Sequence, residues 1–284
     1  MESKVVVIPV YKKTIDAIEE ASLRNTLKVL HRHSIVLVSH KYLDLGFYNN
    51  VSEEEGVDIS VVYFDQKFFS SVEGYNALCY SKEFYERFSS YCYMLICQLD
   101  AWVFSDQLDY WCAKGYDYIG APIFHAYNKT HYTQSIVGIG NGGFSLRRVA
   151  HCLRVLSISQ NRPFVKPLEL IRFYSGLGKY TDGFTQNLFR RIMIVPTVFL
   201  KFFGFGNTLG YYIRKHANED LIFGSWSDKA WGLTSNLPEI DEAMKFSFEV
   251  NPSLLFNKVG HLPFGCHAFT KWEYEEFWNK YIKL

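Results

Sequence analysis

The sequence lacks a heptad pattern, a fixed-period repeat and any apolar stretch long enough to cross a bilayer. Coiled-coil, solenoid and membrane-spanning architectures are therefore excluded. Neither charge is in excess, since 30 Lys and Arg stand against 29 Asp and Glu for a formal net charge of +1. Because a protein dedicated to duplex DNA generally needs a basic stripe to neutralise phosphates, we expect a small-molecule ligand and no nucleic acid partner.

Cysteine is present, but no two cysteines form a Cys-x-x-Cys motif. The six are Cys79, Cys92, Cys97, Cys112, Cys152 and Cys266. The chain enters an apolar strand almost at once (MESKVVVIPVYKK), so we expect no signal peptide. These observations predict free, buried thiols in a reducing compartment, which favours a cytoplasmic protein.

Apolar residues make up 48% of the 284 positions and aromatic residues 18%, enough for a sizeable core. In the first 125 residues, apolar runs alternate with helical patterns, which predicts an α/β fold with a doubly wound, mostly parallel sheet flanked by helices. The expected strands are 5–10, 35–38, 59–64 and 93–97, with helices over 14–32 and 72–89.

The second half of the sequence is less regular. No linker rich in Pro, Gly or Ser divides the chain, so we expect a single domain over 1–284, with a ligand-binding half, 1–125, and a second half, 126–284. The expected elements of the second half are a strand at 117–121, a loop at 123–137, a helix near 146–157, helical pieces within 176–213, a strand at 246–250 and an amphipathic helix from Thr270.

The buried strand YMLIC delivers a carboxylate, Asp100, at its carboxyl end, within Gln98-Leu99-Asp100. Ligands of open α/β sheets bind beyond the carboxyl ends of the strands, and a carboxylate there suits a divalent cation shared with phosphate oxygens. The alternative is that Asp100 caps the following turn. Asp106 and Asp109, which follow in a helix-start context, are expected to be structural.

Three further segments are candidates for a site, and each has a plain structural alternative. In the turn of Asn141, Gly142 and Gly143, the two glycines allow positive φ and close approach of the backbone to a ligand; the alternative is a tight turn before a helix. Glu219 and Asp220 are either candidates for a general base or an acid pair at a helix N-terminus. His267 is either a late metal ligand or a core residue.

The order of these segments resembles that of the GT-A glycosyltransferases, and longer stretches are similar to the DUF5672 family over nearly the whole chain. The stretches that carry the resemblance are VVVIPVY, SLRNTLKVL, FFSSVEGYNALCYSKEFYERF, QLDAWVFSDQLDYWCAKGYDYIGAP, GNGGFSLRR, NED and LPFGCHAF. The family resemblance implies a GT-A-like, Rossmann-type fold and an association with bacterial surface-polysaccharide synthesis. This sequence departs from the DxD pattern at Gln98, which occupies the position of the first acid of that motif.

The resemblance implies roles for the candidate residues. Asp100 and His267 would ligate Mn²⁺ or Mg²⁺, Asn141, Gly142 and Gly143 would line the donor and acceptor site, and Asp220 would be the base of an inverting transfer, with Glu219 orienting a neighbour. The expected donor-binding residues are Pro9, Val10, Tyr11, Asp65, Gln98 and Asp100.

The resulting expectation is a metal-dependent glycosyltransferase that moves a sugar from a nucleotide-sugar to a glycan or lipid-linked acceptor. The alternative is a non-catalytic protein that binds nucleotide-sugar or glycan on the same scaffold. Residues 192–213 are rich in Phe, Leu and Ile; Lys201 lies within them, and Arg214 and Lys215 follow directly. They predict either peripheral contact with the inner face of the membrane or a buried pair of helices.

Overall fold

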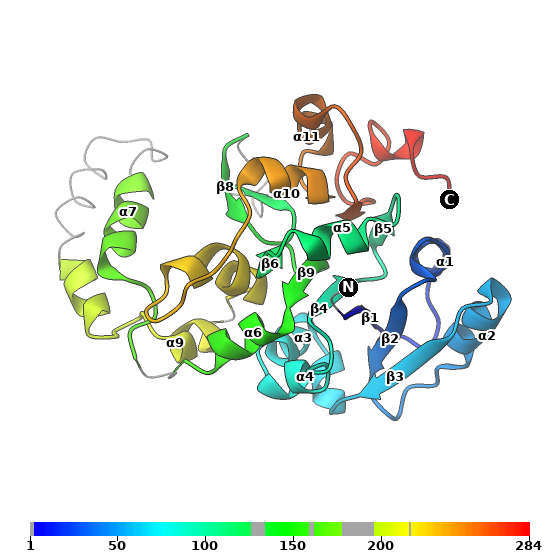
Figure 1. Cartoon of the computed structure of the whole chain (residues 1–284), viewed down its shortest axis with the longest axis horizontal. Helices are drawn as coiled ribbons and strands as arrows, with labels where there is room; N and C mark the ends of the chain where they lie inside the picture. Colours follow the sequence, from blue (N-terminus) through cyan, green and yellow to red (C-terminus); the bar gives the residue numbers. More distant parts are fainter. Residues whose placement is uncertain (1–2, 126–133, 159–161, 178–195, 216) are drawn as a thin grey trace.

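The computed structural model describes residues 3–125, 134–158, 162–177, 196–215 and 217–284 (Figure 1). Its centre is a six-stranded sheet in the order β3-β2-β1-β4-β9-β6, in which β1 to β4 run parallel and β9 is antiparallel to both of its neighbours. The strands are β1 (Lys4–Pro9), β2 (Ser34–Ser39), β3 (Ile59–Tyr63), β4 (Tyr93–Cys97), β6 (Tyr118–Ile119) and β9 (Phe144–Arg148). The expected α/β fold with a mostly parallel, Rossmann-type sheet is confirmed.

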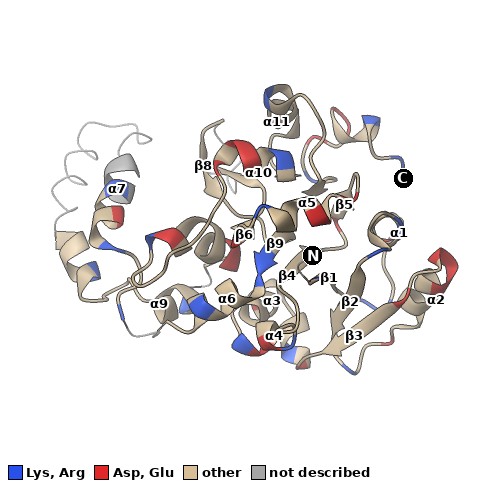
Figure 2. Cartoon of the chain, viewed as in Figure 1, with Lys and Arg blue, Asp and Glu red and all other residues tan. Residues whose placement is uncertain are grey.

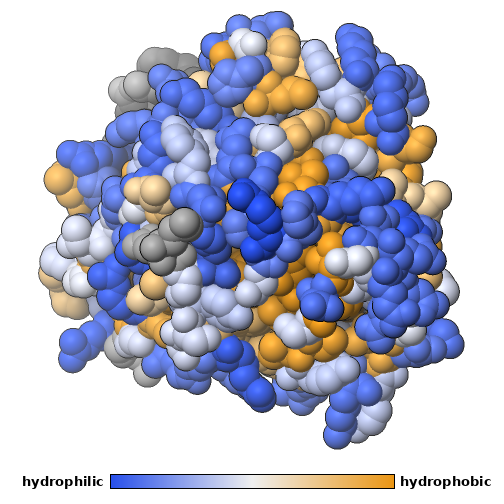
Figure 3. Space-filling model, turned by 45° about the vertical axis from the view of Figure 1, so that its right-hand side comes forward, coloured by the Kyte–Doolittle hydropathy of each residue, from blue (hydrophilic) through white to orange (hydrophobic). Residues whose placement is uncertain are grey.

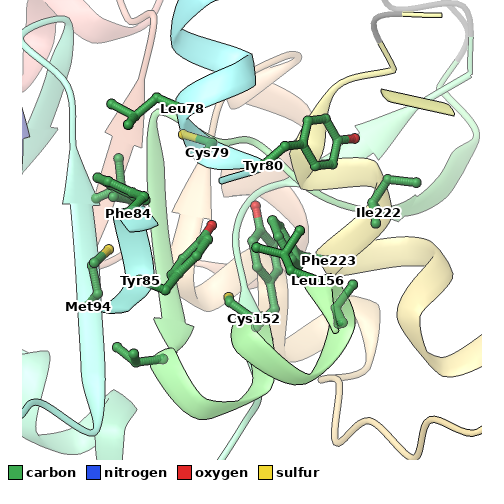
Figure 4. Packing of buried hydrophobic residues seen from close by; sticks show 14 of the residues in the cluster. Leu78, Cys79, Tyr80, Phe84, Tyr85, Met94, Cys152, Leu156, Ile222 and Phe223 are labelled. Atoms are coloured by element: carbon green, nitrogen blue, oxygen red, sulfur yellow. The ribbon is translucent and has the colours of Figure 1, made fainter. Parts of the chain in front are cut away.

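Helices cover both faces of this sheet, which explains why β1, β2 and β4 are continuous apolar runs. Val6 and Ile8 of β1 pack in the same cluster as side chains of α1, α2 and α5. Val5 and Val7 point to the other face and pack with α3, α4 and α6. Figure 4 shows this second cluster, in which Ile222 and Phe223 also lie. The six helices are α1 (Ala17–Leu30), α2 (Gly46–Glu55), α3 (Val72–Cys79), α4 (Lys82–Glu86), α5 (Leu108–Ala113) and α6 (Val149–Leu156).

Local sequence signals fix where the first helix begins and which face it buries. The Asp16 side chain accepts hydrogen bonds from the N–H groups of Ile18 and Glu19, and the Glu19 side chain reaches back to the Asp16 N–H. This capping box satisfies backbone donors that the first turn leaves free. The apolar stripe of α1 then repeats at a helical period and is buried; it is Leu23, Leu27 and Leu30.

Two smaller sheets complete the architecture and bring distant segments together. One is β10-β11-β5, with β5 (Ala101–Val103), β10 (Ser247–Phe248) and β11 (Gly265–His267). In it β11 runs antiparallel to β5 and pairs His267 with Ala101, the residue after Asp100. The other is the hairpin of β7 (Pro122–Phe124) and β8 (Ile136–Ile139).

Of the remaining elements, η1 (Gln66–Phe69) lies between β3 and α3, and the others follow α6 in the chain. These others are α7 (Pro167–Leu177), α9 (Leu209–Arg214), η3 (Leu221–Trp226), η4 (Ser227–Lys229), α10 (Ile240–Phe246), α11 (Pro252–Val259) and η5 (Trp278–Lys280). Within the described residues, no helix is both long and apolar enough to cross a bilayer. Figure 3 shows a band of apolar residues running among hydrophilic ones across the face that it turns to the viewer.

The structure corrects several expected elements of the second half. The helix expected near 146–157 begins only at Val149, because residues 144–148 are the buried strand β9. The expected loop at 123–137 contains parts of the β7–β8 hairpin. The strand expected at 246–250 is shorter, since α10 continues to Phe246.

Two expected helices are also wrong. The helix at 72–89 is two helices, because Ser81 caps α4 and so starts a new helix after α3. The expected helix from Thr270 is a series of turns with a short 3₁₀ segment, and Glu273, with φ of 52°, is incompatible with a continuous α-helix. Of the helical pieces expected within 176–213, residues 178–195 lie outside the described residues.

Candidate functional site

Two adjoining cavities lie where the order of the central sheet reverses. From β1 the chain passes to β2 and then β3 on one side of β1, whereas β4 lies on the other side. The direction of the strand order thus changes between β1 and β4. In open α/β sheets, ligands bind at the carboxyl ends of the strands at such a switch point. The larger cavity, of about 400 Å³, has Pro9 of β1 and Asp100 after β4 in its wall. The smaller, of about 210 Å³, shares Tyr75 and Gln98 with the larger one and extends to the second half of the chain.

The larger cavity gathers most, but not all, of the expected donor-binding residues. Pro9, Tyr11, Gln98 and Asp100 line it, together with aromatic side chains such as Phe68 and Phe69. Two expected residues are placed elsewhere. Val10 is fully buried and its N–H binds the Val38 carbonyl, while Asp65 caps η1 by accepting from the Lys67 N–H.

His267 and Asp100 are brought into contact by the pairing of β11 with β5. His267 Nε2 lies 3.1 Å from Asp100 Oδ1 and 3.1 Å from Gln98 Oε1, and its Nδ1 lies 3.2 Å from Glu249 Oε1. Burial alone would lower the pKa of His267, but Asp100 and Glu249 outweigh burial and raise it to about 10. Burial opposes ionisation of Asp100 as well, yet the facing imidazolium lowers the pKa of Asp100.

The donor atoms around His267 Nε2 are spaced as the ligands of a divalent cation would be. Neighbouring ligands of an octahedral cation with bonds of about 2.1 Å lie about 3 Å apart. The separations from Nε2 to Asp100 and Gln98 match that spacing. Across the described part of the chain, however, no three His, Cys, Asp or Glu side chains form a ready metal-binding group. The residues therefore fit a cation if Gln98 serves as a ligand, if phosphate or water oxygens complete the shell and if His267 gives up its proton.

The glycine turn lies against both halves of the site. The residue with positive φ is Asn141, at 70°, and not Gly142 or Gly143 as the sequence analysis expected. The Asn141 side chain stabilises the turn by accepting from the Gly143 N–H at 3.0 Å. The two glycines are needed for space: a Cβ on Gly143 would overlap the His267 ring, and one on Gly142 would overlap the Glu219 carboxylate.

Glu219 and Asp220 are adjacent in sequence but lie in different environments. Glu219 is buried and forms an ion pair of 2.7 Å with Arg147, a guanidinium with no exposed surface. Tyr118 and Phe223 place their rings near that guanidinium, at 5.6 and 5.9 Å. The carboxylate of Glu219 is thus committed to a buried partner.

Asp220 lines the smaller cavity and keeps a titratable carboxyl there. Its Oδ2 accepts from the Asn141 N–H and its Oδ1 from the Leu221 N–H, each at 2.7 Å. Burial, reinforced by the negative charge of Glu219, raises the pKa of Asp220 to about 7, and the two N–H donors only partly oppose this. A carboxyl that titrates near neutral pH is suited to proton transfer.

The smaller cavity contains residues that the sequence analysis did not single out. Asn76 of α3 holds the acidic segment in place, since its side chain accepts from the Glu219 N–H and donates to the Ala217 carbonyl. Glu249 contacts His267, and Arg147 neutralises Glu219. Arg147 was not identified either, because residues 146–157 were expected to form a helix and the buried strand β9 was not predicted. Nothing in the sequence connects Asn76 or Glu249 to residues more than a hundred positions away or across a different sheet.

The cavities thus lie in an α/β protein whose ligand-binding edge carries a carboxylate–histidine pair and a titratable aspartate. The DUF5672 profile, described as a protein of unknown function, matches residues 58–267. The chain therefore belongs to the DUF5672 family, as its sequence stretches indicated. No curated protein matches the sequence.

Two solved structures show a distant likeness to the chain. A core-mannan synthase A from Aspergillus fumigatus in a Mn/GDP form is similar with a TM-score of 0.36 and 9% identity, over 53% of this chain and 60% of that chain. A cytidylyltransferase from Leptospira borgpetersenii is similar with a TM-score of 0.31 and 7% identity, over 55% of this chain and 64% of that chain. The chain spans less than two thirds of either protein, and similarity at this level carries no inference about activity.

Proposed function

We propose that this protein is a glycosyltransferase that moves a sugar from a nucleotide-sugar donor to a glycan or lipid-linked acceptor in bacterial surface-polysaccharide synthesis. One observation carries the proposal: Asp220, whose carboxyl has a raised pKa, lines the same cavity as His267, and the His267 ring is in contact with the Asp100 carboxylate. A base and a place for a diphosphate are thereby adjacent. The cytoplasmic location and the single-domain organisation stay predictions.

The donor is proposed to occupy the larger cavity at the ends of β1 and β4. Its nucleoside would lie against the aromatic side chains Tyr11, Phe68 and Phe69, which offer apolar area for a base. Asp100 and His267, with Gln98, would hold Mn²⁺ or Mg²⁺. Such a cation neutralises charge that develops on a departing diphosphate.

Asp220 is proposed to activate the acceptor. It takes the proton of an acceptor hydroxyl, whose oxygen attacks the anomeric carbon as the bond from that carbon to the diphosphate oxygen breaks. The electron pair of the broken bond leaves with the nucleoside diphosphate, and attack from the opposite side inverts the anomeric centre. The cavity fits this role because Asp220 lines it and is held in place by two N–H donors.

The neighbours of Asp220 are proposed to act through position. Arg147 holds Glu219 away from the acceptor, while the charge of Glu219 helps keep the pKa of Asp220 near neutral. Gly142 and Gly143 keep the space between the acid pair and His267 clear of side chains.

A non-catalytic role in binding nucleotide-sugar or glycan is the second candidate, and Gln98 favours it. An amide in place of the first acid of a DxD motif supplies no negative charge to a cation, so a cation would be held less tightly.

A panel of nucleotide-sugars, each tested with and without Mn²⁺, separates the two candidates. Ligand binding raises the melting temperature by mass action, and the donor that does so is then assayed for release of nucleoside diphosphate with a mixture of glycan acceptors. Stabilisation with release supports transfer, and stabilisation without release supports the binding role. No stabilisation by any member would contradict both.

A further inference from the structure

An exposed apolar patch that lines neither cavity lies on the segment that follows residue 195. Residues 196–202 form a helical segment, followed by a turn to Gly206. Five large apolar side chains in this segment are between 48% and 68% exposed: Phe199, Leu200, Phe202, Phe203 and Phe205. We call these five residues the phenylalanine patch. Exposed apolar residues are common singly, but a contiguous group of this kind marks an interaction surface.

The patch is held by an ordered scaffold. Asn207 is fully buried, its amide donates to the carbonyls of Val165 and Lys201, and its side-chain oxygen accepts from the Val165 N–H. Val198 is the residue of the segment that joins the core. The rings of Phe199 and Phe203 pack edge to face, with their centroids 5.1 Å apart. The segment therefore uses one apolar side chain for folding and presents the others outward.

The described residues around the patch are strongly basic. An isolated bridge joins Pro163 to Thr208, so segments 162–172 and 196–215 are neighbours in space. Together they contain a single acid, Glu169, and six basic residues: Arg162, Lys166, Arg172, Lys201, Arg214 and Lys215. Figure 2 shows charges of both signs over the rest of the chain, consistent with its net charge of +1. Glu169 forms an ion pair with Arg172 at 2.6 Å. Within these two segments basic residues therefore outnumber acidic ones, although the chain as a whole is nearly neutral.

Apolar side chains bordered by basic ones match the two layers of an anionic bilayer surface. Aromatic and aliphatic groups enter the boundary between headgroups and acyl chains, while Lys and Arg remain at the level of the phosphates. We propose that the phenylalanine patch docks the protein on an anionic lipid bilayer. A second copy of the chain is a poorer occupant, because two such faces would bring like charges together.

The position of the patch relates it to the candidate site without depending on the proposed function. Residues 196–215 lead directly into Asn218–Asp220, which line the smaller cavity. The patch is therefore linked to that cavity through a short stretch of chain, and docking would anchor the protein whatever chemistry the cavity performs. Failure of sugar transfer leaves the docking proposal unaffected, and failure of docking leaves the transfer proposal unaffected.

Flotation of the full chain with vesicles tests this proposal. We expect binding to vesicles of phosphatidylcholine with phosphatidylglycerol, weaker binding to phosphatidylcholine alone, and release at high salt. The double variant Phe199→Ser, Phe203→Ser should lower the partition coefficient at least about tenfold, since two aromatic side chains no longer enter the interface. Arg214→Gln with Lys215→Gln should lower binding to the anionic vesicles alone.

The matched control replaces two large exposed residues elsewhere, Tyr42 (70% exposed) and Leu284 (55%), against 62% for Phe199 and 60% for Phe203. Tyr42→Ser with Leu284→Ser removes exposed apolar side chains outside the patch and should leave flotation unchanged. Circular dichroism checks that each variant is folded. Absence of binding to anionic vesicles would overturn the proposal, as would equal losses in the patch and control variants. So would a dimer of the native chain that the Phe199→Ser, Phe203→Ser variant converts to monomer, because the patch would then be a protein interface.

Discussion

Asp220→Asn is the substitution that separates catalytic from structural importance at the cavity. Asparagine keeps the size of the side chain but removes the carboxylate, and loss of a positioned general base typically lowers turnover by about 10²–10⁴-fold. We expect that loss in nucleoside diphosphate release, with donor affinity nearly unchanged, because the donor is proposed to contact the other cavity.

The pH dependence of turnover follows from the raised pKa of Asp220. With a pKa of about 7, roughly a tenth of the carboxyl is ionised at about pH 6 and roughly nine tenths at about pH 8. Turnover of the native chain at saturating donor should therefore rise about eight- to tenfold between these values and then level off. A pKa near the ordinary value of 3.8 would instead give a flat profile over this range.

The same raised pKa makes a prediction about stability that needs no substrate. The folded state binds the Asp220 proton more tightly than the unfolded chain does. The contribution of this group to the free energy of unfolding is therefore complete below pH 3.8 and is lost as the pH rises through about 7. The shift corresponds to a loss on the order of 4 kcal/mol at high pH. Asparagine carries no charge but accepts only one of the two N–H bonds, which costs about 1–3 kcal/mol.

Urea denaturation of the native chain and of Asp220→Asn at several pH values measures this difference. The variant should be less stable than the native chain at pH values below the pKa of Asp220, and should equal or exceed it above. A difference that is constant with pH would refute the raised pKa. Near-normal turnover in folded Asp220→Asn would refute the proposed base.

Further predictions concern the residues around that carboxyl. Asp100→Ala should abolish the extra thermal stabilisation that Mn²⁺ gives to a bound donor and leave the fold intact, and undiminished Mn²⁺-supported binding would contradict its role. Gly143→Ala should displace His267 and reduce the Mn²⁺ effect more than it lowers the melting temperature, whereas a large fall in melting temperature with an unchanged Mn²⁺ response would indicate a purely structural turn. Arg147→Met should lower the free energy of unfolding in urea by about 3–5 kcal/mol because it leaves Glu219 charged and buried, and adding Glu219→Gln should recover part of that loss; equal single and double variants would show that the ion pair is not the reason.

The parallel half of the sheet could be predicted because its signals are local. Each of β1 to β4 is an apolar run. In the intervening helices the apolar residues recur with a 3.6-residue period, which distinguishes them from the two-residue alternation of a strand. The later elements could not be predicted in the same way. Strand β9 contains two arginines, and it is a strand because β4 offers it a partner and because Tyr85 and Glu219 satisfy Arg147 in the interior.

The candidate site shows the same division. The sequence by itself determined which residue types were available, and Asp100 was identified from its position at the end of a strand. Asp220 and His267 were assigned their roles through the resemblance of the motif order to the GT-A glycosyltransferases. Only the tertiary structure decided which of them meet, because contact between His267 and Asp100 requires the antiparallel pairing of two strands separated by most of the chain. The contrast between Glu219 and Asp220 was likewise decided by packing: burial and neighbouring charge set the pKa of a carboxyl, and neither is a property of the residue itself.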